Sequence, residues 1–374
     1  MASAIVEEKD EPPEEKEPPE AKMGQVADAP PCAWPPAVAE RYERLEKLGQ
    51  GMFGDVYKAR DRRRSGQLVA VKRLSGRTDD RFVHTGPLDF ARQAMSLAAC
   101  RGYPHVVRLV ATYADASSRG DGDSFVVTKY AGPMNLRKYM MERRAQSQPF
   151  LEGEVRRAMR QLLSGAKHVH KAGIVHRDLV PENVIVDQRR RSAKMVYKIG
   201  GFGMSESAAA REGRGDDSAL LASFGPYRAP EAFLGSRDYD GRVDTWALGC
   251  IMAELLVGDG KPFFYAELES EVFVKMQRVV GTKGITEWPG LQRLVGTRER
   301  ELAQAAVRRE QASGGYTSCL GKLFPAEKLS EAGFEVLSGL LEANPERRLT
   351  AAAALRKPWF RRQSRFFGGC CVVP

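Results

Sequence analysis

The spacing of hydrophobic positions changes once along the chain, at the breaker Ala131-Gly132-Pro133. Before it, from residue 42, short runs of β-branched and aromatic residues are separated by glycine loops, which is typical of an antiparallel sheet, with one helical stretch at about 88–99. After it, hydrophobic residues recur at helical spacing. The predicted helices begin with the run Val155, Met159, Leu162, Leu163, Ala166 and Val169 and continue at about 242–257, 269–280, 332–342 and 350–356.

The two ends of the chain differ from this middle part. Residues 1–40 are rich in proline and hold ten acidic and three basic residues, so they are too polar to repay the entropy of ordering, and we expect a disordered tail. Residues 366–374 form a second tail, which contains Cys370 and Cys371. We expect these cysteines to be unmodified. Palmitoylation would fit them better than prenylation, because proline is not a usual last residue of a C-a-a-X ending.

The composition, 43% hydrophobic and 28% charged, is that of a globular protein. No apolar run is long enough to span a bilayer and no leader-like start is present, so we expect an intracellular protein, cytoplasmic, nuclear or both. The six cysteines are scattered, as expected of reduced thiols. The net charge is +10, and since residues 1–40 are acidic the remainder carries +17. Its arginines are dispersed without interleaved aromatics, which favours a solvated surface over a specific nucleic-acid site.

A glycine string, Gly49-Gln50-Gly51-Met52-Phe53-Gly54, lies between two predicted strands. Alone such a string is weak evidence, since glycines also serve plain turns, and a Rossmann site would place it between a strand and a helix. A hairpin between two strands instead lets backbone amides approach phosphates. The strand Val69-Ala70-Val71-Lys72 then adds a lysine that is well placed to hold the α- and β-phosphates of a nucleotide.

The strongest motif is His176-Arg177-Asp178-Leu179-Val180-Pro181-Glu182-Asn183. Its aspartate would accept or orient the proton of a substrate serine or threonine hydroxyl, and its asparagine would ligate a metal. With this motif the chain resembles the eukaryotic protein kinases over residues 42–365. The resemblance implies an α+β, bilobal fold, with a small antiparallel β-sheet N-lobe carrying one helix (42–131) and a mainly helical C-lobe (132–365).

Further landmarks agree with the resemblance. Ala229-Pro230-Glu231 matches the end of an activation segment, Arg348 is placed to pair with Glu231, and Asp244 matches the helix that braces the catalytic loop. Tyr227-Arg228 and the stretch from Gly281-Thr282 to Trp288-Pro289-Gly290 resemble the cyclin-dependent-kinase branch. In that branch Arg228 would suit a pocket for a proline that follows the phosphoacceptor.

The resemblance also implies an ATP pocket. In it Val56, Ala70 and Ile185 would enclose adenine, Thr128 would guard the rear, and the hinge Lys129-Tyr130-Ala131 would bond the base. Leu97, Leu109, His176 and Phe202 match the family's internal hydrophobic stack. The residues expected to contact the nucleotide are Gly49, Gly51, Gly54, Val56, Ala70, Lys72, Thr128, Lys129, Ala131 and Ile185.

Three residues depart from the family at the chemical centre. Gly201 stands where the family has the aspartate of D-F-G, which ligates the metal, so Asn183 alone would make a poor magnesium site. Losing about 4 kcal/mol of metal stabilisation would slow transfer roughly a thousandfold. Gln93 replaces the glutamate that pairs with Lys72, and Val180 replaces a lysine that contacts the γ-phosphate. We therefore expect Mg²⁺ to bind weakly or not to be required for ATP binding.

Regulation and partners are less defined by the sequence. Ser218 lies near the position of the activation-loop phosphosite, and Arg92 and Arg177 match two of the arginines that would hold its phosphate. The third position is Glu206, which would oppose a phosphate, so an ordinary exposed serine is favoured over a switch. The first helix departs from the cyclin-docking signature outside Arg92, which leaves a cyclin partner in doubt. Two functions remain: a protein serine/threonine kinase with weak transfer to protein substrates, and a pseudokinase that binds or regulates a protein partner.

Overall fold

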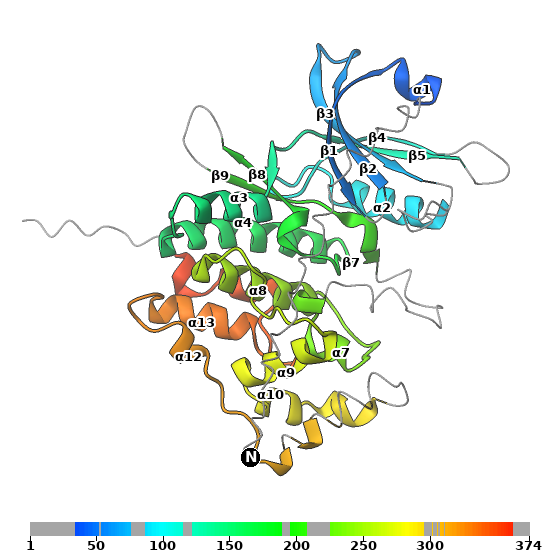
Figure 1. Cartoon of the computed structure of the whole chain (residues 1–374). Helices are drawn as coiled ribbons and strands as arrows, with labels where there is room; N and C mark the ends of the chain where they lie inside the picture. Colours follow the sequence, from blue (N-terminus) through cyan, green and yellow to red (C-terminus); the bar gives the residue numbers. More distant parts are fainter. Residues whose placement is uncertain are drawn as a thin grey trace, which may run out of the picture.

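The computed structural model describes residues 34–361 apart from 52–53, 76–86, 115–121, 189–194, 208–224, 295–300, 302–304, 306 and 310. It confirms the predicted α+β class. A lobe built on an antiparallel sheet lies above a mainly helical lobe (Figure 1). Ser218, Cys370 and Cys371 lie outside the described residues.

The sheet of the N-lobe has five strands in the order β1-β2-β3-β5-β4, and neighbouring strands run antiparallel. Helix α2, which confirms the helix predicted at 88–99, contacts β4 and β5. The elements of this lobe are β1 (Tyr42–Gly51), β2 (Gly54–Asp61), β3 (Gln67–Leu74), α2 (Pro87–Ala99), β4 (Leu109–Tyr113) and β5 (Ser124–Lys129).

One face of this sheet is covered by the segment that precedes it. Trp34 and Val38, the latter in the short helix α1 (Pro36–Ala39), are buried against the sheet. The Trp34 ring meets Tyr57 and Phe125 edge-on, with centroids 5.8 and 6.2 Å apart. Ordered structure therefore begins earlier than the predicted tail boundary at residue 40. Residues 1–33, the rest of the predicted tail, lie outside the described residues.

The C-lobe is organised around two buried helices, α4 (Glu152–Lys171) and α8 (Arg242–Val257), which pack on each other. Helix α4 buries one face, whereas nearly every residue of α8 is buried, because other elements surround it. The predictions at 242–257 and 269–280 are confirmed by α8 and α9 (Glu269–Val280). Those at 332–342 and 350–356 correspond to the shorter helices α13 (Glu331–Leu340) and α14 (Ala351–Leu355).

Small sheets between the lobes position the loops of the site. Strands β6 (Met134–Asn135), β8 (Val184–Gln188) and β9 (Met195–Ile199) form one, and β7 (Ile174–Val175) pairs with β10 (Glu206–Ser207) in another. The remaining helices are α3 (Leu136–Ala145), η1 (Pro181–Asn183), η2 (Phe202–Met204), η3 (Gly225–Tyr227), α7 (Pro230–Phe233), α10 (Lys283–Thr286), η4 (Pro289–Arg293), α12 (Leu320–Leu323) and η5 (Pro358–Phe360). Among the described helices, none has both the length and the apolar character needed to cross a bilayer.

Candidate active site

A cavity of about 430 Å³ opens where the glycine hairpin, the hinge after β5 and the start of β8 face one another. This volume is in the range of small-molecule sites. All ten residues predicted to contact a nucleotide line it, and so do Gln93, Asn183 and Gly201. The cavity is also lined by residues that were not predicted to do so, among them Leu48, Met134, Asn135 and Glu182. Asn135 lies two residues after the Gly-Pro breaker and caps α3, and this position was the available signal.

The glycine string forms the predicted hairpin. Gly49 lies opposite Val56, and Gly51 lies opposite Gly54. Gly54 has φ +128°, and a Cβ on it would lie 1.9 Å from the carbonyl oxygen of Arg73. Only glycine fits at that position, so the close return of β2 along β3 depends on it.

Lys72 lies on β3, between Val56 of β2 and Val126 of β5. Burial of its ammonium group lowers the pKa of Lys72 to about 8, and the nearby Asp178 carboxylate opposes that shift. Gln93, on α2, is only 4% exposed, and its Oε1 has no hydrogen-bond partner within the described part of the chain. Gln93 thus offers Lys72 no charge, whereas the Asp178 carboxylate acts on it.

Asp178 and Asn183 are bound to each other. The amide Nδ2 of Asn183 donates to the Asp178 backbone oxygen at 2.9 Å and to its carboxylate Oδ2 at 2.8 Å. Burial raises the pKa of Asp178 to about 6, against the effects of the Asn183 hydrogen bond and of Lys72. At neutral pH most of this carboxylate is therefore still ionised and able to accept a proton.

Gly201 adopts the left-handed conformation, with φ +75° and ψ +38°. A Cβ there would lie 2.2 Å from Cγ, 2.3 Å from Oδ1 and 2.6 Å from Nδ2 of Asn183. The Asn183 side chain thus fills the space into which a side chain at position 201 would project. The rest of the triplet is retained, because Phe202 is buried and meets His176 edge-on at 4.7 Å, while His176 bonds the Gly200 carbonyl at 2.7 Å.

These residues do not fit a magnesium ion. Mg²⁺ requires oxygen ligands in nearly octahedral geometry and is usually held by one or two carboxylates. Gly201 supplies no side-chain ligand, and Asn183, whose Nδ2 is bound to Asp178, offers only its Oδ1 as a neutral ligand. In the described part of the chain, no three His, Cys, Asp or Glu side chains gather as a metal site would require. Val180, the third departure, is buried in the hydrophobic core and does not line the cavity.

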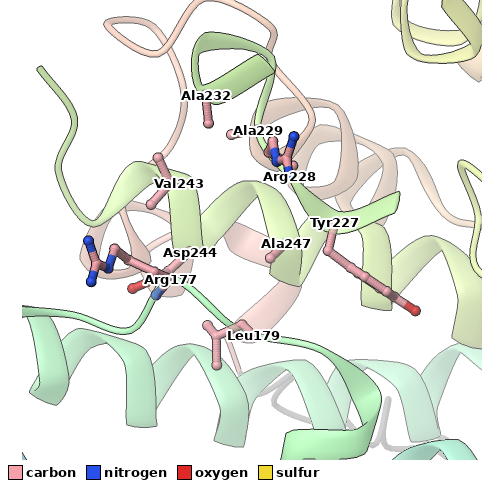
Figure 2. Close-up of a pocket in the computed structure, with 9 residues that line it drawn as sticks. All are labelled: Arg177, Leu179, Tyr227, Arg228, Ala229, Ala232, Val243, Asp244 and Ala247. Atoms are coloured by element: carbon pink, nitrogen blue, oxygen red, sulfur yellow. The ribbon is translucent and has the colours of Figure 1, made fainter. Parts of the chain in front are cut away.

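Of the predicted regulatory residues that the structure describes, Gln93 lines the large cavity, and Arg92, Arg177 and Arg228 do not. Arg92 pairs with Asp89 and reaches the Gly203 carbonyl. Arg228 is buried, with its guanidinium 5.0 Å from the Phe233 ring centroid. Figure 2 shows a second, small cavity of about 20 Å³, which is lined by Arg177 and Leu179 of the catalytic loop, by Tyr227, Arg228, Ala229 and Ala232, and by Val243, Asp244 and Ala247 of α8.

Residues 42–360 match the family described as "Protein kinase domain". The chain therefore belongs to the protein kinase family, whose members generally bind ATP together with Mg²⁺.

Within this family the relatives are cyclin-dependent kinases. The chain is 43% identical to "Putative cyclin-dependent kinase F-2" of Oryza sativa subsp. japonica, over 86% of this chain and 90% of that protein. It is 34% identical to cyclin-dependent kinase G-2 of Oryza sativa subsp. indica, over 86% of this chain but only 42% of that longer protein. It is 30% identical to cyclin-dependent kinase B2-2 of Arabidopsis thaliana, over 87% and 95%. By family it is thus a serine/threonine protein kinase of the cyclin-dependent-kinase type.

Proposed function

We propose that the chain binds ATP in the large cavity and transfers its γ-phosphate to protein serine or threonine weakly or not at all. The observation that carries the proposal is the arrangement at Gly201. Its side chain is missing, and Asn183 occupies the place of that side chain and bonds Asp178. The kinase domain would comprise residues 42–365.

The proposed nucleotide site rests on backbone and on Lys72. The glycine hairpin would present its amides to the phosphates, and the Lys72 ammonium would face the α- and β-phosphates. Thr128 and the hinge from Lys129 to Ala131 would accommodate the base. These groups require no metal, so we propose that ATP binds without Mg²⁺ or with Mg²⁺ held weakly by the phosphates.

In the nucleotide-free chain the base is intact, and the weakness lies in the stabilisation of the charge that develops during transfer. Asp178 is positioned by Asn183 and is mostly ionised at neutral pH. Charge that develops on the γ-phosphate during transfer would meet neither a bound metal nor a lysine at position 180. At about 1.4 kcal/mol for each factor of ten, a deficit of about 4 kcal/mol would leave roughly a thousandth of ordinary activity.

The second candidate is a pseudokinase that presents the kinase fold to a protein partner. The uncharged Gln93, the buried Val180 and Gly201 together favour it. The first candidate, a weak kinase, would act on a protein substrate that has a proline after the phosphoacceptor, and this proline would bind near Arg228. A cyclin is a possible partner of either, although α2 lacks most of the expected docking signature.

The decisive experiment measures binding and transfer on the same protein. ATP affinity is measured by calorimetry in Mg²⁺ and in EDTA, with Lys72→Met as the binding control. Transfer is measured against Asp178→Asn. We expect similar affinities in both media and a loss in Lys72→Met. Affinity that needs Mg²⁺ would overturn the metal-independent site, and turnover at ordinary kinase rates would overturn weak transfer.

A further inference from the structure

The guanidinium of Arg177 is buried beside a carboxylate of the same chain. Its Nη1 lies 3.0 Å from Oε2 of Glu206, and the two side chains are only 2% and 5% exposed. The Tyr239 hydroxyl donates to the same Oε2 at 2.7 Å and accepts from Nη1 at 2.9 Å. Burial raises the pKa of Tyr239, so this hydroxyl stays protonated at neutral pH. We name Arg177, Glu206 and Tyr239 the clamp.

The clamp joins three parts of the fold that are far apart in the sequence. Arg177 belongs to the catalytic loop, Glu206 to β10, and Tyr239 precedes α8. Strand pairing supports the same junction, because Glu206 lies opposite Val175 of β7. Arg177 also donates from Nε to the Met204 carbonyl at 2.6 Å, so one guanidinium holds both the turn after Phe202 and the strand that follows.

The backbone at Arg177 needs such a hold. Its φ of +66° lies in the left-handed region, which strains a residue with a side chain. This strain is offset by the clamp and by the Arg177 amide, which donates to Asp244 Oδ1 at 2.8 Å. The next residue is Asp178, so a change in the backbone at Arg177 would shift the position of that carboxylate.

We propose that Glu206 is a positioning residue: its carboxylate holds Arg177, and through it Asp178, in place without a phosphate group on the segment 208–224. A phosphate that sought Arg177 would have to displace a carboxylate that is already buried and doubly bonded, and would be repelled by it. This inference concerns the catalytic loop and does not depend on whether phosphate is transferred.

Backbone amide exchange at Arg177 reports on the clamp in the full chain. We expect the exchange rate and the ATP affinity of the wild type to remain the same after phosphatase treatment and in Ser218→Ala. Glu206→Gln, which keeps the shape but removes the charge, should raise the exchange rate at Arg177 at least tenfold and shift the Asp178 titration seen by carboxyl ¹³C NMR. Glu206→Asp, which keeps the charge, should recover part of both effects.

The matched control is Glu335→Gln, which breaks the exposed pair with Lys357 and should leave both readouts unchanged. A purely structural Glu206 would lower the melting temperature without moving the Asp178 titration, and that result would overturn the proposal. So would a several-fold change in exchange or affinity on removal of phosphate. If Glu206→Gln does not fold, Tyr239→Phe takes its place. We then expect a smaller shift of the Asp178 titration in the same direction, and the absence of any shift would count against the clamp.

Discussion

Replacing Gly201 with aspartate restores the carboxylate of the family's metal site in sequence, but the structure predicts that this change alone destabilises the protein. A Cβ at position 201 would lie between 2.2 and 2.6 Å from three atoms of the Asn183 side chain. The Asn183 side chain would therefore have to turn away. Turning it breaks both of its hydrogen bonds to Asp178.

The size of the effect follows from two contributions. A residue with a Cβ held at φ +75° costs about 1–2 kcal/mol, at the lower end for aspartate. Each of the two Asn183 hydrogen bonds contributes about 1 kcal/mol, and more for the one to a charged carboxylate. We expect Gly201→Asp to lower the free energy of unfolding by about 3–5 kcal/mol, a large part of the stability of an ordinary domain.

A double-mutant cycle separates the two contributions. Gly201→Ala, Asn183→Ala and the double variant are unfolded in urea, and the free energies are compared. Gly201→Ala should cost about 2 kcal/mol less when Asn183 is already alanine, because only the backbone strain remains. Additivity within about 0.5 kcal/mol would refute the clash between the two residues.

Variants that restore the family's residues test the metal site. Gly201→Asp alone should show no Mg²⁺-dependent gain in ATP affinity, since the Asn183 side chain, once turned away from Asp178, is no longer held where it could act as the second ligand. A gain is expected only when Gln93→Glu and Val180→Lys are added. If Gly201→Asp matches the wild type in stability and also acquires Mg²⁺-dependent binding, the steric reasoning is wrong.

Four further predictions concern charge and packing. Because Lys72 loses its proton above about pH 8, the ATP affinity measured by calorimetry should fall there by up to tenfold per pH unit. Lys72→Arg, which stays protonated, should abolish this fall. Binding ATP near pH 6.5 should take up protons in the wild type but not in Asp178→Asn, measured in buffers of different ionisation enthalpy. Arg348→Met should cost about 3–5 kcal/mol in denaturant unfolding, because Glu231 keeps a buried charge after losing two bonds of 2.7 Å. Trp34→Ala should cost about 3–5 kcal/mol in the same assay, and a change below 1 kcal/mol would show that the segment before β1 contributes little.

Much of the fold and of the cavity was predictable because those signals are local. Periodicity located α8 and α9 to the residue, and the resemblance carried by the short motifs implied ten nucleotide-contacting residues that all line the cavity. The contacts that define the chemistry were not predictable in this way. Asn183 and Gly201 lie on separate segments, and Glu206 bonds Tyr239, which is thirty-three positions further along the chain. Trp34 was misassigned because a proline-rich segment has no periodicity, although one large aromatic residue suffices to anchor it.

The electrostatics of the cavity explain why binding and transfer would separate in this chain. Asp178 is stabilised in its ionised form by Asn183 and by Lys72, and Lys72 is in turn kept protonated by Asp178. ATP phosphates that pair with Lys72 would offset the charge that holds down the pKa of Asp178, and they add negative charge of their own. The pKa of Asp178 would then rise from about 6 toward neutral pH, and the base would be increasingly protonated once the nucleotide is bound. In a kinase with two metal ligands the cation would offset these phosphates. Here the nucleotide that occupies the site would itself weaken the base.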